Sequence, residues 1–324
     1  MLVVVMRKKS LSILAGVLLI FSLIAGIYFS KTEKNFFLQG YSVRDTAAYG
    51  EPLPWEVAKE LYPRFAVADI IDVESGKRLQ VQRRGGTYHA DVQPLTAKDT
   101  QVLKEIYHGK WSWKRRAVIV EIGLNRIAAS VNGMPHGAGN IQDNNFDGHF
   151  CLHFLYSRVH ASNKIDPAHQ LMVWKAAGRP EEPFLKAGPS EVINLVLTAL
   201  NQNDTGLAAL GLYSAKSEDL WLACQALFGR IPEFSVRSIV EEKQENDKAN
   251  DRGDNDNDAD KEDGSGGQMQ DITVQRQFIL ELSLLYPGET VKQERKARLT
   301  VIQDPIGERW FVEGSGLKKI IEEG

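Results

Sequence analysis

An uncharged apolar run at residues 11–29 is the feature that most constrains the fold of this chain. A helix of about twenty such residues is long enough to cross a bilayer. Arg7, Lys8 and Lys9 precede the run, and a basic flank keeps the N-terminus in the cytoplasm. We therefore expect a single-pass helix in the cell membrane with the bulk of the chain outside the cytoplasm. A cleaved signal peptide is the alternative, although no small-residue cleavage pattern precedes Lys31.

A second constraint is the segment 241–271, which is dominated by Asp, Glu, Asn, Lys and Gly. Such a composition cannot bury a core, so we expect a disordered acidic insertion between two strands. Its run of aspartates resembles a calcium-binding loop, but Ala259 and Ser265 occupy the positions where that loop has Gly and Glu. The formal net charge of −3 gives no reason to expect a nucleic-acid partner.

The remaining sequence divides into segments of different pattern. Polar and apolar residues alternate at 78–83 as in a half-buried strand, and Thr96 with Asp99 is typical of a capped helix start. Residues 150–155 fit either a strand or the first turn of a helix. The expected segments are a cytoplasmic tip with the anchor at 1–30, a juxtamembrane stalk at 31–63, a β-rich domain at 64–178, and an α+β unit at 179–324.

All histidines of the chain lie between residues 89 and 169, and Cys151 lies among them. Imidazole titrates near neutral pH and is a common metal ligand. A thiolate beside it acts as a nucleophile or as a ligand. We therefore expect any chemistry in this window. The histidines are His89, His108, His136, His149, His153, His160 and His169.

A His-Gly pair at 136–137 and a Gly-His-Phe-Cys sequence at 148–151 resemble the motif of the L,D-transpeptidase catalytic domain, an exported β-rich fold. That family carries His-Gly, a spacer and Ser/Thr-His-Gly-Cys, so Gly and Phe replace two residues here. The resemblance implies that Cys151 is the nucleophile, that His136 is the base and that His149 belongs to the site. It implies a bacterial cell-envelope enzyme that acts on peptidoglycan peptides without a cofactor.

A zinc site is an alternative interpretation of the same residues. His149, Cys151 and His153 alternate, so on a strand they share one face and offer three zinc ligands. This reading predicts a zinc-dependent peptidase or amidase that uses His136, His149 and His153. Candidates for the fourth ligand are His136, His160 and Asp147.

A non-catalytic envelope protein that binds cell-wall peptide or glycan is a third possibility. Histidines in a Gly- and Asn-rich loop also serve to satisfy backbone groups. Trp111 and Trp113 stand next to basic residues and form a candidate platform for glycan or peptide. His89, Asp91 and His160 are further candidates for contact with substrate, although the turn preferences of Asp and Pro favour a turn at His89 and Asp91.

Residues 185–324 resemble the NTF2-like fold, in which a long helix precedes a curved antiparallel sheet. The resemblance rests on the amphipathic helix from Ser190, the strands at 272–285 and 295–301, and the final strand with Trp310. It implies a pocket-bearing accessory or protein-interaction module. The expected fold class is therefore α+β, with an N-terminal transmembrane helix, a β-rich His/Cys domain and an NTF2-like cone domain.

Overall fold

The computed structural model describes residues 48–160, 162–213, 233–242, 274–286, 288–304, 306 and 308–322. Nearly all of these lie in one compact unit, Tyr49–Gly324. The expected membrane span and the acidic insertion, apart from its first two residues, lie outside the described residues. The same is true of most of the expected stalk.

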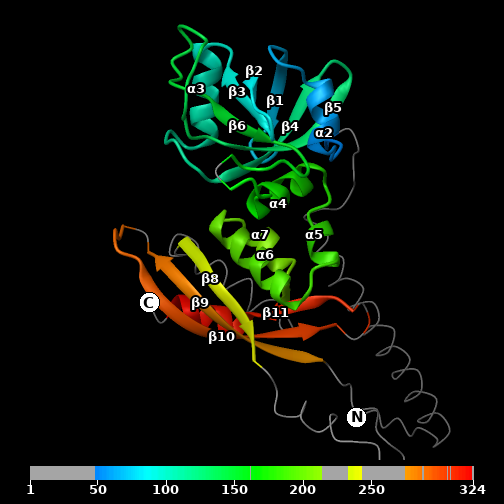
Figure 1. The fold of residues 1–324 in the computed structure, drawn as a ribbon, viewed down its shortest axis with the longest axis vertical. Coiled ribbons are helices and arrows are strands. Elements are labelled where there is room, and N and C mark those ends of the chain that lie inside the picture. Colours follow the sequence, from blue (N-terminus) through cyan, green and yellow to red (C-terminus); the bar gives the residue numbers. More distant parts are fainter. Residues whose placement is uncertain are drawn as a thin grey trace, which may run out of the picture. The chain divides into compact units, whose positions relative to one another are not determined.

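Six antiparallel strands close into a barrel in the order β1-β2-β3-β6-β5-β4 (Figure 1). Pairing of β1 with β4, with Ile70 opposite Val120, completes the closure. Alternate residues of the strands fill the barrel, as Leu79 and Val81 do in β2. The strands are β1 (Val67–Asp72), β2 (Arg78–Gly85), β3 (Ala90–Pro94), β4 (Arg115–Ile122), β5 (Asn125–Asn132) and β6 (Phe150–His153).

Two helices from the N-terminal half of the described chain pack against the barrel strands and complete the barrel core. Helix α3 (Ala97–Ile106) contacts β2 and β3 and begins at Thr96 with the predicted capping box to Asp99. Helix α2 (Trp55–Leu61) lies within the segment expected as a stalk, yet Trp55 is buried in the barrel core. Helix α2 is therefore part of the barrel core and not of a stalk.

Helix α4 (Pro167–Ala176) packs against β4 and β5 on one side and against α6 (Pro189–Asn201) on the other. The Asp166 side chain caps α4 by accepting from the N–H groups of Ala168 and His169. Two short helices flank α6, and α7 packs against it. They are α5 (Glu182–Leu185) and α7 (Thr205–Ala209).

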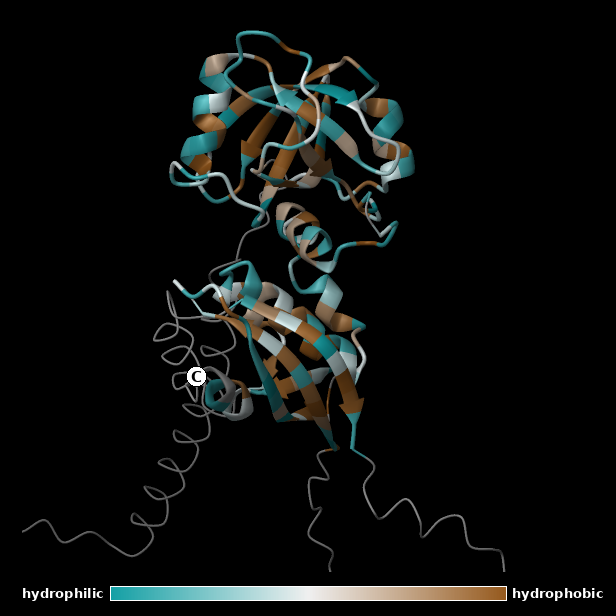
Figure 2. Cartoon of the chain, turned by 60° about the vertical axis from the view of Figure 1, so that its left-hand side comes forward, coloured by the Kyte–Doolittle hydropathy of each residue, from teal (hydrophilic) through white to brown (hydrophobic). Residues whose placement is uncertain are grey.

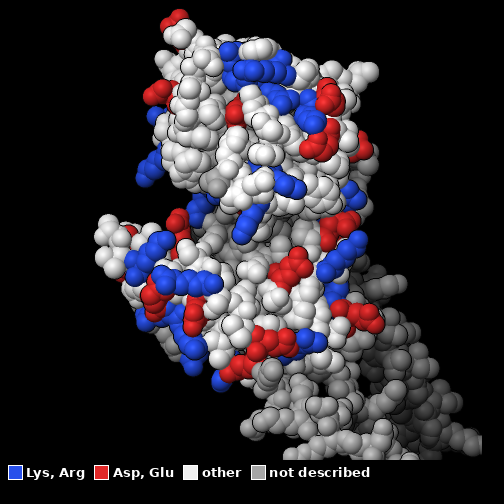
Figure 3. Space-filling model, viewed as in Figure 1, with Lys and Arg blue, Asp and Glu red and all other residues white. Residues whose placement is uncertain are grey.

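The C-terminal part is a five-stranded sheet in the order β7-β11-β10-β9-β8, in which only β7 and β11 run parallel. Apolar residues line its buried side together with α6 (Figure 2). Charged residues of both signs are interspersed on the surface (Figure 3). Some form ion pairs, such as Arg237 with Glu294. The elements are β7 (Leu212–Tyr213), β8 (Glu233–Glu241), β9 (Gln275–Leu285), β10 (Gln293–Gln303), β11 (Trp310–Glu313) and the final helix α9 (Gly314–Glu322).

The expected fold class is wrong. The chain mixes helix and sheet around a closed six-stranded barrel, where we expected a β-rich domain between a transmembrane helix and a cone. Among the described residues, no helix has the length and apolar character needed to cross a bilayer. Barrel closure was missed because it depends on pairing between β1 and β4, which are far apart in the sequence.

Candidate functional site

Two neighbouring strands present the candidate site on the outer face of the barrel. Strands β3 and β6 pair with Asp91 opposite Cys151. Their even-numbered residues, such as Val92 and Phe150, belong to the barrel core, so the odd-numbered side chains point outward. The segment 150–153 is thus a strand and not the start of a helix. A turn was favoured at His89 and Asp91, but Asp91 lies in strand β3 and His89 directly precedes it.

The loop that follows β5 folds back so that His136 lies beside His149. The two residues exchange backbone hydrogen bonds of 2.9 Å and 2.8 Å. Gly148 has φ +102°, and a Cβ there would lie 2.5 Å from the His136 carbonyl oxygen. Only glycine fits this close approach, so Gly148 allows the turn that delivers His136 to the strand of Cys151.

The thiol of Cys151 contacts His136. Cys151 Sγ lies 3.2 Å from His136 Nε2, and His136 Nδ1 donates to the Met134 carbonyl oxygen at 2.8 Å. The second contact assigns the proton of neutral His136 to Nδ1, which leaves Nε2 free to accept the thiol proton. A backbone carbonyl therefore orients the imidazole in the way that a third group orients the base of a nucleophile.

The electrostatics of the site favour a thiolate. Burial raises the pKa of the Cys151 thiol, but hydrogen bonds and charge from His136 and His89 outweigh burial, and the net shift is downward. The hydrogen bond to Cys151 raises the pKa of His136, against a smaller effect of burial. Opposite shifts of the two groups are what an imidazolium–thiolate pair produces.

A second histidine and a carboxylate lie on the other side of the thiol. His89 is buried, its Nδ1 donates to the Arg158 carbonyl oxygen at 2.7 Å, and its Nε2 lies 3.3 Å from Asp91 Oδ1. Burial lowers the pKa of His89, but Asp91 and Cys151 more than reverse this and raise it to about 10. The pKa of Asp91 falls to about 2, because contacts with His89 and His149 outweigh its burial. His89 is therefore a buried cation next to Cys151.

Imidazole rings continue from this site along the outer face of the barrel wall. His153 stacks between His89 and His169, with ring centroids 4.3 Å and 3.7 Å away. His169 Nδ1 is 2.9 Å from Ser130 Oγ, whereas His153 Nδ1 has no hydrogen-bond partner among the described residues. Burial and the positive charge of neighbouring groups lower the pKa of both His153 and His169 well below the ordinary value, so both rings are neutral.

Two of the other expected contact residues lie beside residues of the site, and one does not. His160 is exposed, with Nε2 3.4 Å from Asp91 Oδ1. The Trp113 ring is half exposed and lies 5.2 Å from the His136 ring. The Trp111 ring instead packs against Phe146, so it is a poor platform for a ligand.

Metal-ligand atoms converge in two groups of the described part of the chain. One consists of His89, Cys151 and His153, and the other of His89, Asp91 and His160. The expected zinc set of His136, His149 and His153 is neither of these. The rings of His136 and His149 lie 4.6 Å apart, where the folded-back loop meets β6. The ring of His153 instead stacks with that of His89.

Gln93 is a site residue that the sequence analysis missed. Its side chain is buried, donates to the Gly148 carbonyl oxygen at 2.7 Å and accepts from the N–H groups of Asn140 and Ile141. It therefore fixes the folded-back loop to the start of β6. Its place on β3, two residues after Asp91, is the signal that points to it, because both residues share one face of the strand.

No family model and no curated protein matches the chain. The resemblances to L,D-transpeptidases and to NTF2-like domains therefore stay predictions.

Proposed function

We propose that the chain is a cysteine-dependent acyl transferase or hydrolase acting on cell-wall peptides of a bacterial envelope, with Cys151 as nucleophile and His136 as base. The observation that carries this proposal is the 3.2 Å contact between Cys151 Sγ and His136 Nε2, together with the carbonyl that orients His136. A nucleophile, its base and an orienting group are the three parts that covalent catalysis needs.

In the proposed reaction, His136 Nε2 takes the proton of the thiol, and the Cys151 thiolate attacks the carbonyl carbon of a peptide bond. The carbon–nitrogen bond then breaks. The leaving amine takes the proton back from His136, and the acyl group remains on Sγ as a thioester. An incoming amine or water attacks the thioester, His136 accepts its proton, and the thiol is restored when Sγ leaves.

The groups around the pair support this chemistry. The charge of buried His89 stabilises a thiolate, which leaves His136 free to move the proton. The half-exposed ring of Trp113 lies next to His136, where it can pack against a bound peptide. We therefore propose that Trp113 contacts the substrate and that Trp111, which packs against Phe146, does not. Cell-wall peptide as partner implies that the chain works outside the cytoplasm.

Intact-protein mass spectrometry tests the proposal. The whole chain is mixed with a muropeptide substrate and quenched in acid during turnover. We expect a mass increase equal to the acyl part of the substrate, located on the peptide that contains Cys151. Cys151→Ala should show no adduct, because it lacks the attacking sulfur.

Two further variants sharpen this test. His136→Gln should form the adduct at least about a hundredfold more slowly, as expected for the loss of a general base. His108→Gln is the matched control, because His108 is exposed and lies outside the site. Turnover of the substrate by Cys151→Ala at the wild-type rate would overturn the proposal.

A further inference from the structure

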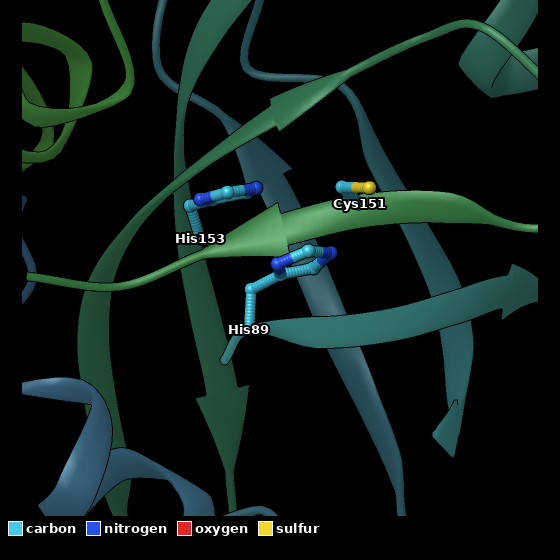
Figure 4. A group of neighbouring side chains, drawn as sticks. All are labelled: His89, Cys151 and His153. Atoms are coloured by element: carbon cyan, nitrogen blue, oxygen red, sulfur yellow. The ribbon is translucent and has the colours of Figure 1, made fainter. Parts of the chain in front are cut away.

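We infer that His89, Cys151 and His153 form a binding site for a soft divalent transition-metal ion, with Zn²⁺ as the first candidate. The ligand atoms of all three residues lie within 4.8 Å of one another. Figure 4 shows the two imidazole rings and the thiol on the same side of the paired strands, with the ring of His153 directed toward Cys151.

The spacing is close to what zinc requires. Zinc bonds of about 2.3 Å to sulfur and about 2.0–2.1 Å to nitrogen place tetrahedral ligand atoms roughly 3.4–3.6 Å apart. Closing the present arrangement therefore brings ligand atoms closer by up to about 1.4 Å, and a ring must also turn out of the His89–His153 stack so that both in-plane lone pairs face the ion. Pairing of β3 with β6 holds the backbone of Cys151 in place, so the site needs no change of fold.

The hydrogen bonds of the two histidines also suit a metal. His89 Nδ1 donates to the Arg158 carbonyl oxygen, which leaves Nε2 as the ligand atom, and metal-bound histidines commonly have such an outer partner. His153 Nδ1 is buried and has no hydrogen-bond partner in the described part of the chain, and His89 Nε2 has only the 3.3 Å ion pair with Asp91. Buried polar atoms without partners are rare in folded proteins, and a bound ion is one explanation for them.

The charges of the site accommodate a dication. Binding displaces the proton of the Cys151 thiol and the Nε2 proton of the His89 imidazolium and releases both to solvent, so the sulfur contributes a negative charge and His89 a lone pair. Asp91 Oδ1 lies 3.3 Å from His89 Nε2, outside the group formed with Cys151 and His153, and supplies a second negative charge near the site. A Cys/His/His donor set suits zinc and cobalt better than magnesium or calcium, which prefer oxygen ligands alone.

A metal bound here uses the sulfur that the proposed reaction needs. If Cys151 is the nucleophile, Zn²⁺ is therefore an inhibitor and not a cofactor, and this consequence rests on the proposed function. The binding site itself does not depend on that function, because it requires only the three side chains.

Zinc binding to the whole chain, expressed without a histidine tag and stripped with EDTA, tests the site. Titration against a chromophoric chelator should show one Zn²⁺ per chain bound at Cys151. Removal of a direct ligand should cost more than the roughly 10–100-fold typical of outer partners, so we expect at least about a hundredfold weaker binding in each variant. The variants are His89→Ala, Cys151→Ser and His153→Ala.

Two histidine variants serve as matched controls. His108→Ala removes an exposed histidine outside the site and should bind zinc like the wild type. His136→Ala removes the other histidine that contacts the thiol and should also keep binding within a few fold. Loss of binding in His136→Ala with retention in His153→Ala would overturn the proposed ligand set.

The spectrum of the Co²⁺ protein gives a test that needs no folded His153 variant. In a Cys224→Ser background, which leaves Cys151 as the only cysteine, we expect a sulfur-to-cobalt charge-transfer band and the strong visible bands of tetrahedral cobalt. A weak octahedral spectrum without the charge-transfer band would overturn the site.

Alkylation of Cys151 in the same background separates the two proposals. Fast alkylation of the metal-free protein that Zn²⁺ blocks supports both. Fast alkylation that saturating Zn²⁺ leaves unchanged overturns the metal site and leaves the nucleophile in place. A Cys151 that is inert without metal, in a protein that still shows the cobalt–thiolate band, supports the site and argues against the proposed function.

Discussion

Two polar clusters on the barrel differ in how completely their charges are paired. At one end of β1, buried Asp72 accepts from Arg116 through both carboxylate oxygens, at 2.8 Å and 2.7 Å. The backbone N–H and the hydroxyl of Ser75 also donate to Asp72. Each carboxylate oxygen of Asp72 therefore has a well-formed hydrogen bond.

At the candidate site the pairing is looser. Asp91 faces three histidines at 3.3–3.7 Å, and these pairs lack the short double contact that Arg116 makes with Asp72. His153 is buried, yet its Nδ1 has no partner among the described residues. The polar groups of the Asp72 cluster are therefore fully paired, whereas those around Asp91 and His153 are not.

The largest expected difference between the two clusters is the loss of turnover rate on replacing Cys151. We expect Cys151→Ala to lower the rate of muropeptide turnover by at least about 10⁴-fold, because no other group replaces the attacking sulfur. Its free energy of unfolding should stay within about 1 kcal/mol of the wild type, since only one sulfur atom is removed. Steady-state kinetics and urea denaturation measure both quantities. A large loss of stability with little loss of rate would mean that Cys151 serves the fold and not the reaction.

The next effect is on stability. Asp72→Asn removes the carboxylate that accepts two hydrogen bonds from Arg116 and leaves Glu74, 3.0 Å away, as its remaining charged partner, so we expect a loss of about 1.5–3 kcal/mol at pH 7. Hydrogen bonds and charge from Arg116 and Ser75 outweigh burial and lower the pKa of folded Asp72. The stabilisation is therefore present above the unfolded pKa, near 4, and is lost as the pH falls through the lower folded pKa.

Urea denaturation at several pH values checks this prediction. The difference between wild type and Asp72→Asn should be largest at neutral pH and should shrink below about pH 4. A difference that stays constant with pH would mean that packing, and not the ion pair, accounts for the loss.

The smallest effect concerns His153. The Nδ1 atom of buried His153 lacks a hydrogen bond, and replacing such a side chain with an apolar one of similar size is close to neutral or stabilising. We expect His153→Leu to change the free energy of unfolding by less than about 1 kcal/mol, in contrast to Asp72→Asn. A loss of 3 kcal/mol or more, measured by urea denaturation, would show that His153 is held by interactions as complete as those of Asp72.

Local patterns in the sequence predicted local structure well. Thr96 and Asp99 form the predicted capping box, and the half-buried strand predicted at 78–83 is present in β2. These features depend on neighbouring residues, so composition and spacing are enough to indicate them. Strand β3 was not predicted, because a turn was favoured at His89 and Asp91.

Features that depend on distant pairing were not predicted. His89 reaches Cys151 only because β3 pairs with β6 in a particular register. The closed barrel depends in the same way on the pairing of β1 with β4. The Met134 carbonyl that orients His136 belongs to the backbone, so no residue type marks it. The family resemblance therefore paired His136 with Cys151, but nothing in the sequence placed His89 beside the thiol.

The pH dependence of Cys151 alkylation tests the central claim, that the folded chain activates this thiol, most directly. It is measured on metal-free protein in the Cys224→Ser background. We expect a midpoint below the value of about 8.5 for an ordinary cysteine, and a shift to higher pH in His136→Gln. A midpoint at or above 8.5 that does not move in His136→Gln would contradict the account.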